Sequence, residues 1–182
     1  MKRVPHIRPA LAAALLLSQL LMAQSFLTSA SHVQASGYLS RSAARPGDTL
    51  VAAVVLEIKK GFHVNAHQPT LDYLIPTTLQ LQAPEGIGVR PVQYPKALVR
   101  KFGFSEEPLA VYEGRTVLRF DLVVDPKAVV AARELKGKVR VQACDHKACY
   151  APATIEVAIK VPLAAKGAAV QPTHPEIFKP ES

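Results

Sequence analysis

Two cysteines five positions apart are the residues of this chain best suited to covalent chemistry. Cys144 and Cys149 are its only cysteines, and they enclose the four residues 145–148. Two thiols at this spacing can close a disulfide, bind a metal together, or exchange their disulfide with that of another protein. Predicted β-strands lie on both sides of the pair, and a hairpin-like connection can bring the two sulfurs within bonding range.

The short loop between the cysteines argues against a purely structural disulfide. In the chain-entropy model, closing a loop of about six residues stabilises a fold by roughly 2 kcal/mol, against about 4.7 kcal/mol for a 100-residue loop. A short exposed loop is also a setting in which a disulfide is open to attack by a thiolate. Disulfide exchange is therefore the favoured interpretation, with a structural bridge and a metal site as the alternatives.

The side chains inside the loop would tune the cysteine pKa in opposite directions. Lys147, and His146 when it is protonated, favour a thiolate, whereas Asp145 disfavours one. The sequence alone leaves the sum of these effects open.

A metal site would need further ligands beside the cysteines. His146 is one candidate, and His63 and His67 are two others. The segment that holds His63 and His67 is typical of a strand that enters a loop, where residues four apart are roughly 13 Å apart and cannot share one ion. We therefore expect no metal and no bound cofactor. A metal-binding envelope protein that uses Cys144, Cys149 and His146 remains an alternative.

The elements that must position the cysteines are predicted to be short β-strands. Residues 49–58 alternate with a period of two, which is typical of a half-buried strand. Only 127–135 is predicted to be helical. Many short strands with turns between them predict an all-β sandwich or barrel. The predicted strands are 38–42, 49–58, 62–65, 77–82, 88–94, 109–112, 115–124, 138–143 and 153–161.

The sequence predicts the structure of two connections between strands. Glu113 and Gly114 form a predicted tight hairpin turn between two strands. Residues 95–108 form a long irregular connection that contains Phe102, Gly103 and Phe104, and loops of that length are often functional.

The two ends of the chain are predicted to lie outside the folded domain. The first 35 residues contain a basic segment, an apolar run and small residues after it, with candidate cleavage sites after Ala30 or Ala35, an order typical of a secretory signal peptide. The residues 163–182 are rich in proline and are predicted to be a flexible tail, in which 175–178 could dock. One domain over 36–162 remains.

The charge of the chain argues against nucleic-acid binding. Its net charge is +8, but the basic residues are scattered singly and form no basic stripe. Lys2, Arg3 and Arg8 belong to the predicted signal peptide. After its removal, nothing is apolar for long enough to cross a membrane. We therefore expect an exported protein that is not inserted in the membrane, in a compartment where disulfides persist.

The chain resembles the N-terminal periplasmic domain of DsbD, the bacterial thiol:disulfide interchange reductase. The likeness is most specific in the two flanks of the cysteine loop, 142–144 and 149–152. Ala151 departs from the family, which often has a second proline there. The likeness covers about residues 36–162 and includes 44–48, 60–65, 102–107 and 111–114.

The resemblance implies an immunoglobulin-like β-sandwich with a redox-active Cys144–Cys149 disulfide. It also implies an aromatic cap loop over 100–107 that covers the disulfide and opens when a partner binds. By the same resemblance Cys149 is the attacking residue. The cap residues are Phe102, Gly103 and Phe104, and further residues near the site are His63, Asn65 and Tyr150.

The resemblance implies partners as well. The family's domain receives reducing equivalents from a membrane partner and passes them to periplasmic disulfide isomerases or thioredoxin-like proteins. Since this chain contains no membrane electron path, we expect a separate donor of the DsbD or CcdA type. The implied activity is that of a protein-disulfide reductase in the periplasm. The alternative from another class is a non-catalytic immunoglobulin-like binding module with a structural disulfide.

Overall fold

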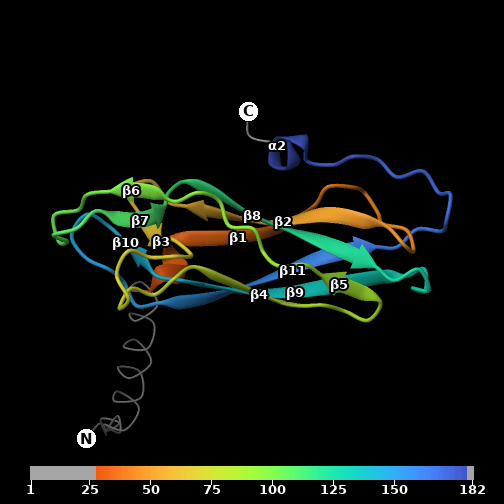
Figure 1. Cartoon of the computed structure of the whole chain (residues 1–182), viewed down its shortest axis with the longest axis horizontal. Coiled ribbons are helices and arrows are strands. Elements are labelled where there is room, and N and C mark those ends of the chain that lie inside the picture. Colours follow the sequence, from red (N-terminus) through yellow and green to blue (C-terminus); the bar gives the residue numbers. More distant parts are fainter. Residues whose placement is uncertain (1–27, 180–182) are drawn as a thin grey trace, which may run out of the picture.

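The structure, a computed structural model, describes residues 28–179, so most of the predicted signal peptide lies outside the described residues. These residues form an elongated β-sandwich (Figure 1). The first sheet has the order β1-β2-β8-β5, and the second has the order β11-β9-β4. The first sheet consists of β1 (Val33–Leu39), β2 (Thr49–Ile58), β8 (Arg115–Val124) and β5 (Ile87–Val89). The second consists of β11 (Ala153–Pro162), β9 (Ala132–Val141) and β4 (Thr78–Gln82).

A third small sheet lies at one end of the sandwich and carries the first cysteine (Figure 1). Its strand order is β10-β3-β7-β6, and all neighbouring strands are antiparallel. Since β10 follows β9 after one residue, the cysteine segment prolongs a long core strand of the second sheet. The small sheet consists of β10 (Ala143–Cys144), β3 (His63–Asn65), β7 (Leu109–Tyr112) and β6 (Leu98–Arg100).

Alternating side chains build the core between the first two sheets. In β8 every second residue, from Thr116 to Val124, is buried, and β9 shows the same alternation from Leu135 to Val141. At Gly37 the sheets come so close that a Cβ atom would lie 2.3 Å from Cγ1 of Ile159. Only a residue without a side chain fits there. The antiparallel sheets confirm the predicted all-β sandwich.

The C-terminal segment is packed against the sandwich, which differs from the predicted flexible tail. Thr173 donates a hydrogen bond from Oγ1 to the carbonyl of Leu39 at 2.6 Å, and Arg119 donates one to the carbonyl of Ile177 at 2.7 Å. The short helix α2 (Pro175–Phe178) inserts the buried Ile177 against Ala53 and Val55. Because α2 covers the outer face of β2, that strand is buried on both faces.

Most predicted strands are present, but three local predictions were wrong. The predicted helix 127–135 is a turn followed by β9, in which pairing with β4 and β11 decides the conformation. The Glu113–Gly114 turn joins two different sheets and is not a hairpin, since β7 pairs with β3 and β6, and β8 pairs with β2 and β5. The connection 95–108 contains β6, so the irregular part is the hairpin tip 101–108.

The fold also begins earlier than predicted. A 3-10 turn, η2 (Ser29–Ser31), precedes β1, which starts at Val33. Residues 28–35 therefore belong to the folded domain, although the sequence placed them in the signal peptide. Within the described residues no helix is long and apolar enough to cross a membrane.

Candidate redox site

The two cysteines form a disulfide across a tight hairpin loop. Cys144 ends β10, and the Cα atoms of Cys144 and Cys149 are 3.9 Å apart. Backbone hydrogen bonds close the loop inside and outside the pair, from Asp145 N to Ala148 O at 2.9 Å and from Tyr150 N to Ala143 O at 2.8 Å. The hairpin-like connection expected from the sequence is thus formed, and it holds both sulfurs within bonding distance.

Asp145 stabilises the turn of this loop. Its Oδ1 accepts hydrogen bonds from the backbone N–H groups of Lys147 at 2.7 Å and Ala148 at 2.9 Å. Its Oδ2 accepts the hydroxyl proton of Tyr150 at 3.0 Å. The two backbone bonds, and then the tyrosine bond, lower the pKa of Asp145 to about 2. The carboxylate is therefore charged throughout the physiological range and holds the turn, while His146 and Lys147 are exposed to solvent.

The two cysteines differ sharply in exposure. Cys144 is 1% exposed, whereas Cys149 is exposed. Cys149 is therefore the cysteine that a thiolate from another protein can approach, whereas Cys144 is shielded from solvent. The sequence pattern left the pair symmetric, and only the burial of β10 distinguishes the two residues.

His63 and two phenylalanines form a group of stacked rings next to the buried cysteine. In the antiparallel pair β3–β10, His63 lies directly opposite Cys144, and residues at such positions share one face of the sheet. The ring of Phe102 stacks on His63 with centroids 3.9 Å apart, and the Phe104 ring lies 5.4 Å from Phe102 and 6.4 Å from His63. The three rings form a stack that begins beside Cys144, so the structure brings the predicted cap residues and His63 together.

The tip of the β6–β7 hairpin carries this stack. Lys101 donates a hydrogen bond to the carbonyl of Glu106, and Ser105 Oγ donates one to the carbonyl of Glu107 at 2.7 Å. Arg100 and Glu113 form an ion pair at 3.2 Å across the base of the hairpin. Gly103 lies exposed between the two phenylalanines. The hydrogen bonds of Lys101 and Ser105 are exposed to solvent. Phe102, in contrast, packs on the buried Leu74, Leu109 and Val111.

A hollow of about 330 Å³ lies beside the exposed cysteine. Cys149 and Ala148 form part of its wall, and Phe104 and Tyr73 form another part. Tyr73 is 77% exposed and Phe104 is 39% exposed, so both rings are open to solvent. The sequence did not single out Tyr73, because it lies in an irregular connection with no motif of its own.

His63 is held in its neutral form. Burial lowers the pKa of His63, and the opposing attraction of Glu113 and Asp145 is smaller. His63 is 3% exposed, and its Nε2 atom is buried without a hydrogen-bond partner. A neutral imidazole with an uncommitted nitrogen beside a cysteine can exchange a proton with a thiol.

Asn65, another residue predicted to lie near the site, is linked to the cysteine loop by hydrogen bonds. Asn65 is fully buried and donates hydrogen bonds from Nδ2 to the carbonyl of Ile75 at 3.0 Å and to Oε1 of Gln142 at 3.2 Å. Gln142 in turn donates to the carbonyl of Tyr150 at 3.4 Å. Asn65 therefore contacts the cysteine loop through Gln142, a residue that no sequence motif indicated.

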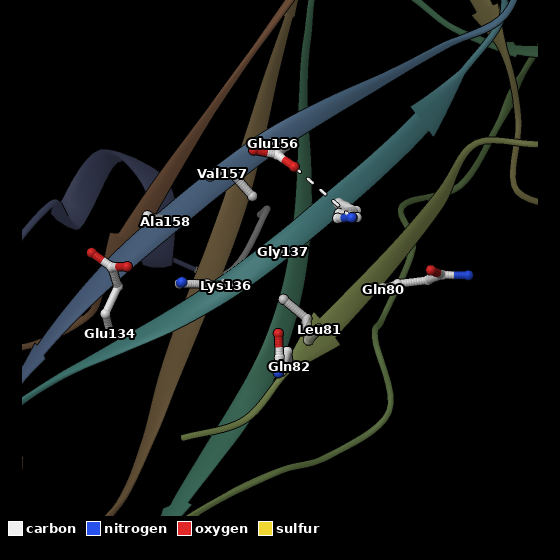
Figure 2. Close-up of a pocket in the computed structure, with 10 residues that line it drawn as sticks. Gln80, Leu81, Gln82, Glu134, Lys136, Gly137, Glu156, Val157 and Ala158 are labelled. Atoms are coloured by element: carbon white, nitrogen blue, oxygen red, sulfur yellow. Dashed lines mark ion pairs between the residues drawn. The ribbon is translucent and has the colours of Figure 1, made fainter. Parts of the chain in front are cut away.

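A larger hollow lies elsewhere on the molecule. It has a volume of about 690 Å³ and lies over β4, β9 and β11, where polar side chains such as Gln80, Lys136 and Glu156 surround Gly137 (Figure 2). The ion pair drawn there joins Glu156 to Lys138 at 3.9 Å. This hollow contains neither cysteine and none of the cap residues. Among the described residues, no group of three His, Cys, Asp or Glu side chains could hold a metal ion.

Comparisons with known proteins identify relatives of this chain. The family model for the N-terminal part of the thiol:disulfide interchange protein DsbD matches residues 33–161. No curated protein matches the chain. Two solved structures are similar: the N-terminal periplasmic domain of ScsB from Proteus mirabilis, with 9% identity and a TM-score of 0.48, and the N-terminal domain of Neisseria meningitidis DsbD in the reduced form, with 15% identity and a TM-score of 0.39.

The two structures differ in how much of them the chain spans. The chain aligns over 72% of its own length with the ScsB domain but spans only 46% of that structure. It aligns over 74% of its length with the DsbD domain and spans 90% of it. The family assignment rests on the match to the family model, which contains both cysteines and the cap residues.

Proposed function

Because the chain belongs to the family of the N-terminal domain of the thiol:disulfide interchange protein DsbD, we propose that it passes reducing equivalents to partner proteins through Cys144 and Cys149. The observation that carries this proposal is the unequal exposure of the two cysteines. Cys149 is exposed next to a hollow, and Cys144 is buried behind it. This arrangement gives one sulfur access to a partner and keeps the other ready for the resolving step.

The electron transfer proceeds in two displacements. In the reduced protein the Cys149 thiolate attacks a disulfide sulfur of the partner, a mixed disulfide forms, and the second partner sulfur leaves as a thiolate and takes up a proton. Cys144 then loses its proton and attacks the Cys149 sulfur. The Cys144–Cys149 disulfide forms, the partner leaves fully reduced, and two electrons have moved to it. A separate dithiol donor must reduce the disulfide again.

His63 is placed to accept the proton of Cys144 in the second displacement. It lies opposite Cys144 in the β3–β10 pair, and burial keeps it neutral. A thiol becomes a nucleophile only as a thiolate, so a neighbouring neutral imidazole lowers the barrier to resolution. Asp145 does not have this role, because its carboxylate is bound to the turn.

Phe102, Gly103 and Phe104 form the cap in this proposal. Phe104 shares the hollow with Cys149, and Phe102 shields the His63 ring. A partner that enters the hollow must displace Phe104, which is tethered by few buried contacts. Phe104 narrows the approach to Cys149, so small thiols in solution react more slowly than they would with an uncapped disulfide.

The proposed compartment is the periplasm, and the proposed partners are redox proteins. Disulfides form and persist in oxidising compartments outside the cytosol, and it is there that proteins need a relay to reduce them. The donor is a membrane protein of the DsbD or CcdA type, and the acceptors are thioredoxin-like proteins or disulfide isomerases. Such a relay must release each partner, which favours a contact of less than roughly 1,200 Å² in total.

A trapping experiment tests the proposal. Cys144→Ser keeps the exposed attacking thiol and removes the resolving one, so it is expected to accumulate covalent adducts in envelope extracts, seen on non-reducing gels as dithiothreitol-sensitive bands. Cys149→Ser is the matched variant and is expected to trap far less, because its remaining thiol is buried. If neither variant traps a partner while the wild-type protein still binds one non-covalently, the chain is a binding module with a structural disulfide.

A further inference from the structure

The N-terminal turn η2 is bonded to both flanks of the cysteine loop. Ser29 Oγ accepts the backbone N–H of Ala143 at 2.8 Å and donates its own proton to the carbonyl of Ala151 at 2.8 Å. The backbone N–H of Ser29 donates to the same carbonyl at 3.0 Å. Ala143 is the residue before Cys144, and Ala151 is two residues after Cys149. The Ser29 hydroxyl therefore joins the chain segment that precedes Cys144 to the segment that follows Cys149.

This contact set, which we call the N-terminal clasp, is buried and long-range. Ser29 is 0% exposed and lies 114 and 122 residues from its two partners in the sequence. Thr28 also forms a parallel bridge with Ala151. The hairpin loop has its own closing bonds, so the clasp is an additional restraint that the cysteine segment cannot supply itself.

His32 extends the clasp to the loop side chains. Its ring stacks on Phe62 with centroids 3.9 Å apart and lies 4.7 Å from the ring of Tyr150. Tyr150 in turn donates its hydroxyl proton to Asp145, the anchor of the turn. Residues 29–32 thus contact both the backbone that flanks the cysteines and the aromatic side chain that follows them.

We propose that Ser29 is a positioning residue for the redox loop, and that export processing leaves Ser29 on the mature chain. The first part rests on the proposed function. When Ser29 holds Ala143 and Ala151 together, the two thiols of the reduced protein stay close, which raises the effective concentration of Cys144 at the Cys149 sulfur. Closure of the disulfide and resolution of a mixed disulfide then need less ordering of the loop.

The second part follows from where the bonded residues lie. Cleavage after Ala30 or after Ala35, the two sites that the sequence suggests, would remove Ser29 and leave the N–H of Ala143 buried without its partner. An unsatisfied buried donor costs free energy of its own. Any processing of this chain is therefore expected to take place before Ser29.

The redox test compares Ser29→Ala with Ser29→Thr, which keeps the hydroxyl, and with Ser36→Ala, which removes an exposed hydroxyl further along β1. The measurement is the equilibrium constant for closing the Cys144–Cys149 disulfide in glutathione buffers. We expect Ser29→Ala to lower it about fivefold, the equivalent of roughly one buried hydrogen bond. Ser29→Thr should recover part of this loss, and Ser36→Ala should equal the wild type.

The equilibrium constant for disulfide closure distinguishes a serine that positions the cysteine loop from a serine that only stabilises the fold. A serine that only stabilised the fold would stabilise the oxidised and reduced proteins equally, and the closure constant of Ser29→Ala would equal that of the wild type. That result would overturn the first part. If instead the wild-type protein itself exchanged with no thiol at all, the proposed function would fail, and the failure would be visible without any Ser29 variant.

The processing test needs no variant. The full chain is expressed in a Gram-negative host, and the intact mass of the protein recovered from the envelope identifies its first residue. A first residue at or before Ser29 supports the inference. A mature chain that begins at Ser31 or Ser36 would overturn it.

Discussion

Cys144 and Cys149 share one disulfide but not one environment. The buried Cys144 lies opposite His63, on which Phe102 stacks, while Cys149 lines a hollow. Exposure decides which sulfur a partner attacks, and the neighbours of the other sulfur decide how quickly the mixed disulfide resolves. At this scale the individual side chain controls the chemistry, and His63 is the residue whose contribution is easiest to isolate.

Replacing His63 is expected to change how stability depends on pH. Because burial lowers the pKa of His63 in the folded protein, the unfolded chain takes up a proton first as the pH falls. The stability associated with the neutral ring is fully present above about pH 6.5 and is lost progressively below it. His63→Phe keeps an aromatic ring under Phe102 without the titration, so its loss of stability between pH 7.5 and pH 5 should be smaller than that of the wild type.

Urea midpoints at the two pH values measure this effect. His63→Gln, which also lacks the titration but loses the ring stack, should show the same flattened pH dependence at a lower overall stability. Equal pH dependence in the wild type and both variants would contradict a buried, neutral His63.

The elements around the site differ in how firmly they are held. β3 and β10 are joined to the core through buried residues such as Val64 and Ala143, whereas the hairpin tip 101–108 is held mostly by exposed polar contacts. Segments with few buried contacts open with the least free energy. The rigid part of the site therefore carries Cys144, and the part most easily opened carries Phe104.

The two cap phenylalanines are expected to respond differently to truncation. Phe104→Ala should cost roughly 1 kcal/mol or less, because the ring is 39% exposed, and should speed the reaction of the disulfide with glutathione by uncovering Cys149. Phe102→Ala should cost about 1–2 kcal/mol, because that ring packs on Leu74, Leu109 and Val111. Stopped-flow reduction and denaturant unfolding of the two variants separate shielding from packing. If the reduction rates of both variants equalled that of the wild type, the two phenylalanines would not shield the disulfide.

The whole molecule separates its redox end from the rest of the sandwich. The cysteines, the cap and the N-terminal clasp gather near the small sheet β10-β3-β7-β6, while α2 packs on the outer face of the first sheet (Figure 1). The C-terminal segment joins the other elements through buried contacts of Ile177 and backbone bonds to Ser40 and Ser42. We infer that this segment stabilises the domain and does not take part in exchange.

Truncation of the buried α2 side chain tests that separation. Ile177→Ala removes a side chain that is 1% exposed and is expected to cost about 2–4 kcal/mol of unfolding free energy. The closure constant of the Cys144–Cys149 disulfide should equal that of the wild type. Val129→Ala is the matched control, because Val129 is an aliphatic residue that is 71% exposed. A lowered closure constant in Ile177→Ala alone would show that the two ends of the domain are coupled.

The sequence by itself determined the strand pattern and the reactive pair. The predicted strand 49–58 coincides with β2, and 115–124 coincides with β8, because a period of two is a local property of the chain. The spacing of Cys144 and Cys149 and the motifs around them were enough to identify the loop. The predicted helix 127–135 failed because pairing partners in β4 and β11, distant in sequence, override a local preference.

Only the tertiary structure decided which cysteine faces a partner and what holds the loop. Burial of Cys144 depends on β3, which lies about eighty residues earlier in the chain, and the contacts of Ser29 span more than a hundred residues. The sequence placed 28–35 in the signal peptide and 163–179 in a flexible tail, but both segments are folded, because each finds buried partners on the sandwich. Such contacts arise from packing between segments far apart in the chain, and a local sequence pattern therefore cannot predict them.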